Sequence, residues 1–281
     1  MIIDIHTHLY PKVIRDNRQA FFAGEPAFQL LYDSPRAKMA GPQDLLAVMD
    51  DQGVDKAVIF GFPWRSLETA KINNDAVAEA VARHPDRFIG FCCLDPAHPQ
   101  APAEVERTLT SGLGGIGELA FYQGGINAAA LAALDPIMAL AKQRACPVLI
   151  HTNEPVGHAY PGKSPNTLVQ IYAMVRRYPD NTIILAHWGG GLFFYALLKK
   201  EVSEAMANVV VDTAASPFVY QPQVYRHAVD IVGAERILFG SDFPLLEPKR
   251  YFAELDQNGL TPEQLALIRG GNAARILGLA D

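Results

Sequence analysis

Eight short apolar runs, most of them followed by a helical segment, predict that this chain folds as a (β/α)8 TIM barrel of the α/β class. Each run is almost continuously hydrophobic, as in parallel strands covered on both faces, and repeated strand–helix units imply a parallel sheet. The length of 281 residues suits one closed barrel, which takes about 250 residues. An open doubly wound sheet is the alternative. No linker or low-complexity tract divides the chain, so we expect a single domain over 1–281.

The strands are expected where apolar runs lie between turn signals. The first run alternates isoleucines with polar residues, which is the period of a strand. The eight predicted strands cover residues 2–8, 56–61, 88–94, 114–119, 147–151, 182–187, 208–212 and 236–242.

Helical segments separate these strands. Gly53 ends the first of them, and His84-Pro85 ends the second. The last begins at Thr261, where Pro262 and Glu263 are start signals. The predicted helices cover residues 43–52, 67–83, 102–110, 128–144, 164–178, a segment that ends near 206, 221–232 and 261–277.

A long irregular stretch, about residues 10–42, follows the first strand. A compact domain seldom leaves so many residues as a plain loop. At the top of a barrel such an insertion commonly forms a lid or a wall of the substrate site. We therefore predict a lid or insertion here, with a surface excursion as the alternative.

The composition narrows the function classes. The net charge is −6 with no basic block, which argues against nucleic acid as a partner. No apolar run approaches the roughly 20 residues that span a bilayer, and the first residues do not resemble a signal peptide. Cys92, Cys93 and Cys146 lie in apolar runs without paired metal-ligand spacing. We interpret them as reduced core residues of a cytoplasmic protein.

Polar residues gather at the carboxyl ends of the predicted strands, where barrel enzymes build their active sites. His6 and His8 lie two residues apart on one strand and therefore share a face. Histidines and carboxylates together suit Zn²⁺ or a similar divalent ion, and a carboxylate beside a metal-bound water can act as a base. Each of these residues alone could instead be a buried core residue whose polar atoms are hydrogen-bonded within the protein. The residues at this rim are His6, His8, Glu118, His151, His187 and Asp242.

Other residues after strand ends are candidates for the substrate site. Arg65, next to Trp64, could bind a substrate carboxylate through two hydrogen bonds, or it could be a surface arginine. Asn153 and Trp188 follow the fifth and sixth strands and could also contact substrate. Asp212 ends the seventh strand. It could orient a ligand histidine or cap a helix.

These motifs, taken in order, resemble the amidohydrolase superfamily, in the amidohydrolase-related or amidohydrolase 2 branch, which holds the aminocarboxymuconate-semialdehyde decarboxylase-like enzymes. The resemblance spans almost the full length and implies a (β/α)8 barrel. It also implies that His6, His8, His151 and Asp242 bind metal, with His187 as a catalytic group or second-site ligand. The matching stretches are IDIHTH at 3–8, HTN at 151–153, AHWGG at 186–190, GSDFP at 240–244 and GNAARIL at 271–277.

Glu118 departs from this pattern. Several amidohydrolases bridge two metals with a carboxylated lysine at the end of strand four, and Glu118 resembles the carboxylate bridge of other branches. Decarboxylases of the amidohydrolase 2 branch generally use one metal and do not need this glutamate. Glu118 therefore favours a hydrolase, although a structural acid hydrogen-bonded to the rim is the alternative.

The main functional prediction is a metal-dependent hydrolase of a small-molecule amide, ester or lactone. Metal-activated water would attack a carbonyl polarised by the metal or His187, and Asp242 would transfer the proton. One alternative is a metal-dependent, non-oxidative decarboxylase of an unsaturated or aromatic carboxylic acid. In that reaction His187 and Asp242 would protonate the substrate carbon. A catalytically silent binding barrel is the other.

The expected cofactor is Zn²⁺, with Mn²⁺ as the alternative, at one or two ions per chain. The expected partner is a small-molecule substrate, without nucleic acid or membrane. Members of the resembling family are often dimers or larger, so a homodimer stays open, although no stripe in the sequence demonstrates an interface.

Overall fold

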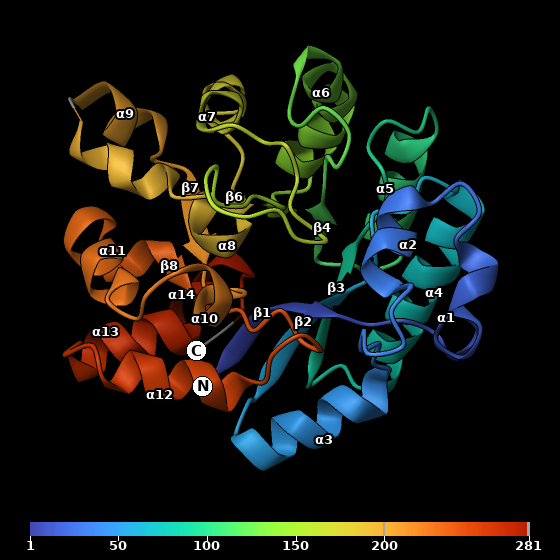
Figure 1. Ribbon diagram of the computed structural model, residues 1–281, viewed down its shortest axis with the longest axis horizontal. Coiled ribbons are helices and arrows are strands. Elements are labelled where there is room, and N and C mark those ends of the chain that lie inside the picture. The colour runs from blue at the N-terminus through green and yellow to red at the C-terminus, as the bar shows by residue number, and fades with distance from the viewer. Residues whose placement is uncertain (199, 280–281) are drawn as a thin grey trace.

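The computed structural model describes residues 1–198 and 200–279, and it confirms the predicted barrel. Eight parallel strands follow one another in chain order around the sheet, and helices surround them (Figure 1). The strands are β1 (Ile3–His8), β2 (Lys56–Phe60), β3 (Phe88–Cys92), β4 (Gly115–Leu119), β5 (Val148–Ile150), β6 (Ile183–Leu185), β7 (Val209–Asp212) and β8 (Ile237–Leu238).

The barrel closes where the last strand meets the first. The backbone N–H of Ile5 donates to the carbonyl of Phe239 at 2.9 Å, and that of Asp242 donates to the carbonyl of His6 at 3.0 Å. Strand β8 itself has only two residues, because Arg236 belongs to a 3₁₀ helix and Asp242 has a left-handed φ of 60°. Phe239 and Asp242 bond β1 outside the regular ladder. This closure brings Asp242 against the histidines of β1.

Apolar side chains cover both faces of the barrel wall. On β2, Ala57 and Ile59 belong to one buried cluster, whereas Val58 and Phe60 belong to a second cluster that includes Ala273. Because successive side chains of a strand point to opposite faces, the two clusters lie on the two sides of the wall. The barrel is therefore packed on both sides, and chemistry is left to the rim.

The helices lie close to their predicted places. Ser66 caps the second of them by accepting the N–H of Thr69 at 3.3 Å, as its residue type favours. The closing helical segment contains a π-helical turn, η4 (Leu267–Gly271). The other helices are α3 (Pro42–Gln52), α4 (Leu67–Arg83), α5 (Ala101–Thr110), α6 (Ala128–Gln143), α7 (Leu168–Arg177), α11 (Val224–Val232), α13 (Pro262–Ala266) and α14 (Asn272–Ile276).

Two predicted helices need correction, and further helices were not predicted. Helix α7 begins at Leu168 rather than at residue 164, because Thr167 and Gln170 form a capping box. The helix predicted to end near 206 is two segments, the 3₁₀ helix η2 (Leu192–Leu197) and α9 (Lys200–Ala205); residue 199 lies outside the described residues. Short helices that were not predicted are α8 (Ala186–Gly189), α10 (Ser216–Val219), η3 (Ala234–Arg236) and α12 (Pro248–Asp256).

The stretch 10–42 is not irregular, since it forms three short helices. Phe28 is fully buried, and its ring lies 4.2 Å from that of Trp64. Glu25 accepts the backbone N–H groups of Arg65 at 3.1 Å and Ser66 at 2.7 Å. These contacts attach the insertion to the loop after β2, and its role as a lid stays a prediction. The three helices are α1 (Lys12–Asp16), η1 (Arg18–Phe21) and α2 (Pro26–Tyr32).

Two predictions from composition can be compared with the structure. Cys92, Cys93 and Cys146 are buried and free, as core residues should be. Over the described part of the chain, no helix combines the length and the apolar character needed to cross a membrane.

Candidate metal centre

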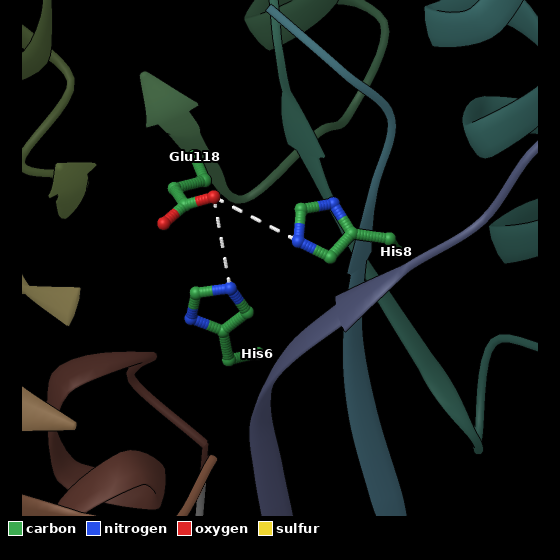
Figure 2. A group of neighbouring side chains, drawn as sticks. All are labelled: His6, His8 and Glu118. Atoms are coloured by element: carbon green, nitrogen blue, oxygen red, sulfur yellow. Dashed lines mark ion pairs between the residues drawn. The ribbon is translucent and has the colours of Figure 1, made fainter. Parts of the chain in front are cut away.

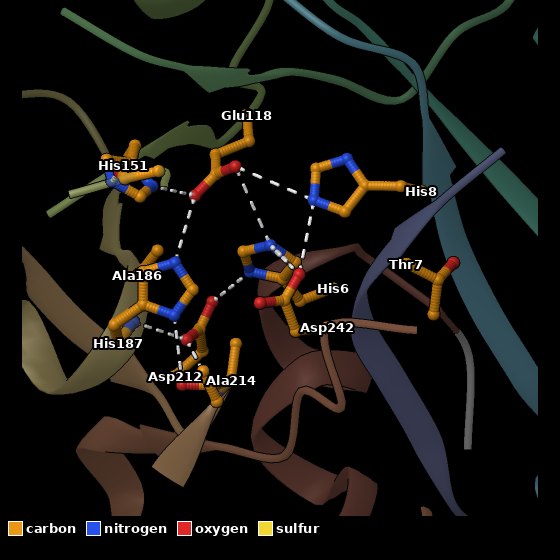
Figure 3. A network of polar contacts seen from close by, with 12 residues as sticks. His6, Thr7, His8, Glu118, His151, Ala186, His187, Asp212, Ala214 and Asp242 are labelled. Atoms are coloured by element: carbon orange, nitrogen blue, oxygen red, sulfur yellow. Dashed lines mark hydrogen bonds and ion pairs between the residues drawn. The ribbon is translucent and has the colours of Figure 1, made fainter. Parts of the chain in front are cut away.

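The six predicted rim residues lie together, although they come from the ends of five strands. Figure 3 shows their side chains directed towards one another. The barrel explains the convergence, because parallel strands present their carboxyl ends on one rim. The residues are His6 and His8 from β1, Glu118 from β4, and His151, His187 and Asp242, which follow β5, β6 and β8.

The two histidines of β1 face two carboxylates. Oδ1 of Asp242 lies 3.6 Å from Nε2 of His6 and 3.3 Å from Nε2 of His8. Oε2 of Glu118 lies 3.7 Å from each of the same two nitrogens (Figure 2). Two nitrogens and two oxygens therefore surround one small space.

The second oxygen of Glu118 faces the other two histidines. Oε1 lies 2.9 Å from Nδ1 of His151 and 3.5 Å from Nε2 of His187. Glu118 thus stands between two pairs of imidazoles. The sequence prediction that this glutamate belongs to the rim cluster agrees with its position.

The outer nitrogen of each histidine is held by an acceptor behind the cluster. A neutral imidazole has one N–H, so an outer acceptor that takes it leaves the inner nitrogen with a free lone pair. All four inner nitrogens face Glu118 or Asp242. The outer contacts are His6 Nδ1 with Asp212 Oδ2 (2.8 Å), His8 Nδ1 with Gly61 O (3.0 Å), His151 Nε2 with Gly162 O (3.0 Å) and His187 Nδ1 with Ala214 O (2.9 Å).

Asp212 holds more than one part of the site. Besides His6, it accepts the backbone N–H of His187 at 2.8 Å and that of Ala214 at 3.0 Å through Oδ1. His187 has a left-handed φ of 54°, a conformation that costs an L-residue about 1–2 kcal/mol. The hydrogen bond from Asp212 helps to hold His187 in this conformation.

Burial and charge act in opposite directions on the two carboxylates. Burial favours a higher pKa for Glu118, but the charges of His6 and His151 outweigh it and hold the pKa well below its usual range. Burial likewise acts to raise the pKa of Asp242, and the hydrogen bond with His8 and the charge of His6 lower it below its usual range. Both groups are therefore carboxylates that require positive charge beside them.

The histidines respond to the same charges. Burial acts to lower the pKa of His6, but the charges of Glu118 and Asp212 raise it to about 10 in the metal-free protein. Burial also acts to lower the pKa of His187. The hydrogen bond to Glu118 outweighs burial and raises this pKa to about 9. The cluster therefore favours positive charge, whether as protons or as a cation.

The cluster fits a divalent metal ion. Nε2 of His6 is buried and has no hydrogen-bond partner within residues 1–198 and 200–279. Two donors bound at about 2.1 Å to a tetrahedral ion lie about 3.4 Å apart, close to the distances across the cluster. Imidazole nitrogens with carboxylate oxygens suit first-row divalent ions. Three groups have all their ligand atoms within 4.8 Å of one another: His6, His8 and Glu118; His6, His187 and Asp242; and Glu118, His151 and His187.

The structure does not bring Trp64 and Arg65 to this cluster. Trp64 is fully buried, and its Nε1 donates to Oδ1 of Asn73 at 3.0 Å. Arg65 is exposed and donates to the carbonyl of Gly24 at 3.4 Å. Their predicted roles in substrate binding stay predictions without support from these contacts.

Trp188 and Asn153 also have other partners. Nε1 of Trp188 donates to Oγ of Ser216 at 2.8 Å, and the residue is fully buried. Oδ1 of Asn153 accepts the N–H of Ser164 at 2.8 Å and its hydroxyl at 2.7 Å. Asn153 therefore fixes the loop between β5 and α7, and its predicted contact with substrate stays untested.

Aromatic residues that the sequence did not single out lie beside the cluster. Tyr122 follows β4; its ring lies 5.6 Å from that of His151 and stacks on Phe62 at 6.1 Å with an angle of 11°. Burial, together with the charges of Asp242 and Glu118, raises the pKa of Tyr32 above its usual range. An aromatic residue just past a strand end was the signal for Tyr122, whereas nothing in the sequence marks Tyr32.

Comparisons with known proteins show which proteins this chain resembles. The sequence model of the amidohydrolase family matches residues 3–279. A γ-resorcylate decarboxylase of Polaromonas sp. (strain JS666 / ATCC BAA-500) is 26% identical over 74% of this chain and 79% of the relative. A 2-amino-3-carboxymuconate-6-semialdehyde decarboxylase of Dictyostelium discoideum is 24% identical over 99% of this chain and 91% of the relative.

Solved structures share the fold at lower identity. The 5-carboxyvanillate decarboxylase of Sphingomonas paucimobilis superposes with a TM-score of 0.77 and 21% identity, over 99% of both chains. A dihydroxybenzoic acid decarboxylase of Polaromonas sp. JS666, with bound manganese and the inhibitor 2-nitroresorcinol, gives a TM-score of 0.73 and 21% identity, over 99% of this chain and 97% of that one.

These comparisons correct the predicted reaction. The prediction of an amide, ester or lactone hydrolase is wrong, because these curated relatives are decarboxylases. The error came from Glu118: a carboxylate on the fourth strand describes how a metal is held and does not specify the bond that is broken. The match over residues 3–279 shows that the chain belongs to the amidohydrolase family.

Proposed function

We propose that this protein is a metal-dependent, non-oxidative decarboxylase of a small aromatic or unsaturated carboxylic acid. The decarboxylase relatives support this reaction. The structural observation that carries it is the grouping of His6, His187 and Asp242, whose ligand atoms lie within 4.8 Å of one another. A metal ligand and two groups able to carry protons thus meet at one point.

The ion would be held by His6, His8, Glu118, His151 and Asp242, with His187 beside it. Zn²⁺ is the ion that we favour from the donor types, and Mn²⁺ is the alternative, since a similar structure contains manganese. When bound, the ion supplies a Lewis acid for the oxygens of the substrate.

Side chains of the protein would transfer the proton to the substrate carbon. Decarboxylation of an aromatic acid adds a proton at the carbon that carries the carboxylate; the C–C bond then breaks, carbon dioxide leaves, and the bonding electrons return to the ring. Nδ1 of His187 is occupied by Ala214, so Nε2 is the nitrogen that can donate or accept a proton towards substrate. Asp242 can take up a proton on its second oxygen, and the pair can pass the proton to carbon.

Aromatic neighbours favour a planar substrate. The rings of Phe62 and Tyr122 are almost parallel, and Tyr122 lies against His151. Offset stacking on such rings stabilises a conjugated acid. This arrangement supports an aromatic or conjugated acid rather than a saturated one.

The test is a panel of acids with detection of carbon dioxide. Metal-loaded protein is incubated with γ-resorcylate (2,6-dihydroxybenzoate), 5-carboxyvanillate, 2-amino-3-carboxymuconate-6-semialdehyde and further hydroxybenzoates. We expect release of carbon dioxide from at least one acid, and no release by chelated protein. Metal-loaded protein that releases none from the whole panel contradicts the proposal.

Two further predictions belong to this proposal. The sequence predicts a cytoplasmic protein, and the family resemblance makes a homodimer a natural assembly. Light scattering coupled to gel filtration distinguishes a dimer from a monomer of 30.7 kDa.

A further inference from the structure

We propose that Lys163 and Glu154, an ion pair in the loop between β5 and α7, are positioning residues for the ligand candidate His151. The pair holds the carbonyl of Gly162 where it accepts a hydrogen bond from Nε2 of His151, so that Nδ1 faces the metal cluster. This inference rests on the proposed function only in that the same site binds a divalent ion, and it does not depend on which acid is the substrate.

The loop between β5 and α7 is long and has no helix or strand over residues 151–167. Such loops are uncommon in compact domains and usually serve a function. Because no helix or sheet bonds its backbone, its shape depends on side-chain contacts. Nζ of Lys163 donates to Oε1 of Glu154 at 2.7 Å, and Oε2 of Glu154 accepts a hydrogen bond from the hydroxyl of Tyr160 at 2.8 Å. The ion pair thus joins the two halves of the loop.

All the hydrogen bonds of the Lys163 ammonium group lie inside the loop. Besides Glu154, it donates to the carbonyls of Val156 at 2.8 Å and His158 at 3.3 Å, so each of its three N–H bonds has an acceptor. The side chains of Lys163 and Glu154 are only 15% and 18% exposed, and salt screens such a pair much less than a surface pair. These contacts leave Lys163 no N–H for a substrate, so its role is to hold the loop.

The peptide between Gly162 and Lys163 transmits this constraint to His151. Its N–H, on Lys163, donates to the carbonyl of Tyr160 at 3.1 Å. Its carbonyl, on Gly162, accepts a hydrogen bond from Nε2 of His151 at 3.0 Å. A trans peptide is planar, and its N–H and C=O point in opposite directions. Holding Lys163 therefore fixes the direction of the carbonyl that faces His151.

The carbonyl of Gly162 determines which nitrogen of His151 faces the cluster. A carbonyl can only accept, and a neutral imidazole has one N–H, so Nε2 carries the hydrogen and Nδ1 keeps a free lone pair. Nδ1 lies 2.9 Å from Oε1 of Glu118 (Figure 3), on the side where an ion would be held. Without the carbonyl, the hydrogen can move to Nδ1, and the tautomer with this hydrogen cannot bind an ion through that nitrogen.

A separate contact anchors the start of the loop. Nδ2 of Asn166 donates to the carbonyl of His151 at 3.1 Å, and Oδ1 of Asn166 accepts the N–H of Ile126 at 3.1 Å. These bonds do not involve the ion pair. We therefore expect a variant without the pair to fold, while the carbonyl of Gly162 loses its support.

The test measures metal affinity and the imidazole of His151 in the absence of any substrate. Lys163→Met removes the ammonium group and keeps an unbranched side chain. Competition with a chromogenic chelator gives the Kd for Zn²⁺. Nuclear magnetic resonance of Zn²⁺-loaded protein with ¹⁵N-labelled histidines gives the rate at which each imidazole N–H exchanges with solvent. The signals of His151 are those that disappear in His151→Gln.

We expect two changes together in Lys163→Met. The Kd for Zn²⁺ should rise about tenfold, the lower end of the effect of losing an outer partner of a metal ligand. The Nε2–H of His151 should exchange faster because its acceptor is no longer held, while the N–H groups of His6 and His187 keep their rates. Either change alone, neither change, or equally faster exchange at all three histidines in a folded variant overturns the inference.

Two further variants make the result specific. Glu154→Gln keeps the size of the side chain and removes the charge that pairs with Lys163. It should change the Kd and the exchange of His151 in the same direction, and it keeps the test valid if Lys163→Met fails to fold. Lys142→Met is the matched control, since Lys142 pairs with Asp180 outside this loop, and it should change neither quantity.

The failures of this inference and of the proposed function are distinguishable. Weaker Zn²⁺ binding with faster exchange at His151, but no release of carbon dioxide from any acid by the unaltered protein, would retain the positioning pair and reject the decarboxylase. Release of carbon dioxide by the unaltered protein, with Lys163→Met and Glu154→Gln unchanged in Kd and exchange, would do the reverse.

Discussion

Oδ2 of Asp212 lies 2.8 Å from Nδ1 of His6, and both groups are fully buried. The same carboxylate accepts the backbone N–H of His187 through its other oxygen at 2.8 Å. One residue at the end of β7 therefore fixes a ligand candidate from β1 and a proton carrier that follows β6. The geometry of the cluster therefore depends on this connection as well as on the six rim residues.

Replacing Asp212 should weaken metal binding without removing any ligand. Asp212→Asn keeps the size of the side chain but loses the negative charge. In the unaltered protein this charge orients His6 and makes its imidazole more basic. Loss of such a partner typically lowers metal affinity 10–100-fold, so we expect an increase of about that size in the Kd for Zn²⁺. Competition with a chromogenic chelator measures it. Asp230→Asn on α11, where Asp230 pairs with Arg226, is the control. Equal affinities for the two variants would show that Asp212 has no role in the centre.

Removing both histidines of β1 should abolish metal binding. His6→Ala with His8→Ala removes two of the nitrogen donors nearest to Asp242. Elemental analysis after metal loading is the measurement, and far-ultraviolet circular dichroism checks the fold. His98→Ala with His227→Ala, which lies outside the cluster, should keep its metal. A full complement of metal in the β1 variant would mean that this strand does not hold the ion.

The rim could be predicted from the sequence because a parallel barrel has few places for polar residues. Apolar runs marked the strands, and the residue type at each strand end marked His151, His187 and Asp242. Their convergence followed from strand order alone. What could not be predicted is which nitrogen each histidine presents: His151 offers Nδ1 because a carbonyl in a distant part of the loop, Gly162, holds Nε2.

The direction of a side chain after a strand end could not be predicted from the sequence. Trp64 and Trp188 stand next to motif residues, yet both are buried and bonded to other groups, because neighbours in a loop take different sides. The short helices within 10–42 have five, four and seven residues, too few to show a helical period. The reaction itself was misjudged, since one set of donors serves several chemistries.

Tyr251 on α12 should support the position of Asp242. Its hydroxyl donates to the carbonyl of Ser241 and accepts the N–H of Ala215 at 3.0 Å. Tyr251→Phe leaves buried polar groups without partners, which costs about 1–3 kcal/mol in free energy of unfolding. It should also lower kcat, because Ser241 precedes Asp242.

Urea denaturation measures the stability of this variant, with Tyr195→Phe as the control because Tyr195 is exposed. If Tyr251→Phe changes the free energy of unfolding no more than the control does, the hydroxyl contributes nothing to the loop.

Asp242→Asn should separate metal binding from turnover. The amide oxygen can still contact an ion, but the side chain no longer takes up a proton. We expect a folded protein that keeps much of its metal, with kcat lower by at least about 100-fold, the lower scale for loss of a general acid–base group. The measurement pairs metal content with the initial rate on the best acid of the panel. A metal-loaded variant with the wild-type rate would reassign proton transfer to His187.

Decarboxylation in deuterium oxide tests the central claim most directly. With the best acid as substrate, mass spectrometry and nuclear magnetic resonance follow the product while a gas detector follows carbon dioxide. We predict one carbon dioxide for each product molecule and one deuteron at the carbon that carried the carboxylate. Chelation should stop the reaction, and added Zn²⁺ or Mn²⁺ should restore it. A product that retains the carboxylate, or full activity in the chelated protein, would contradict a metal-dependent decarboxylase.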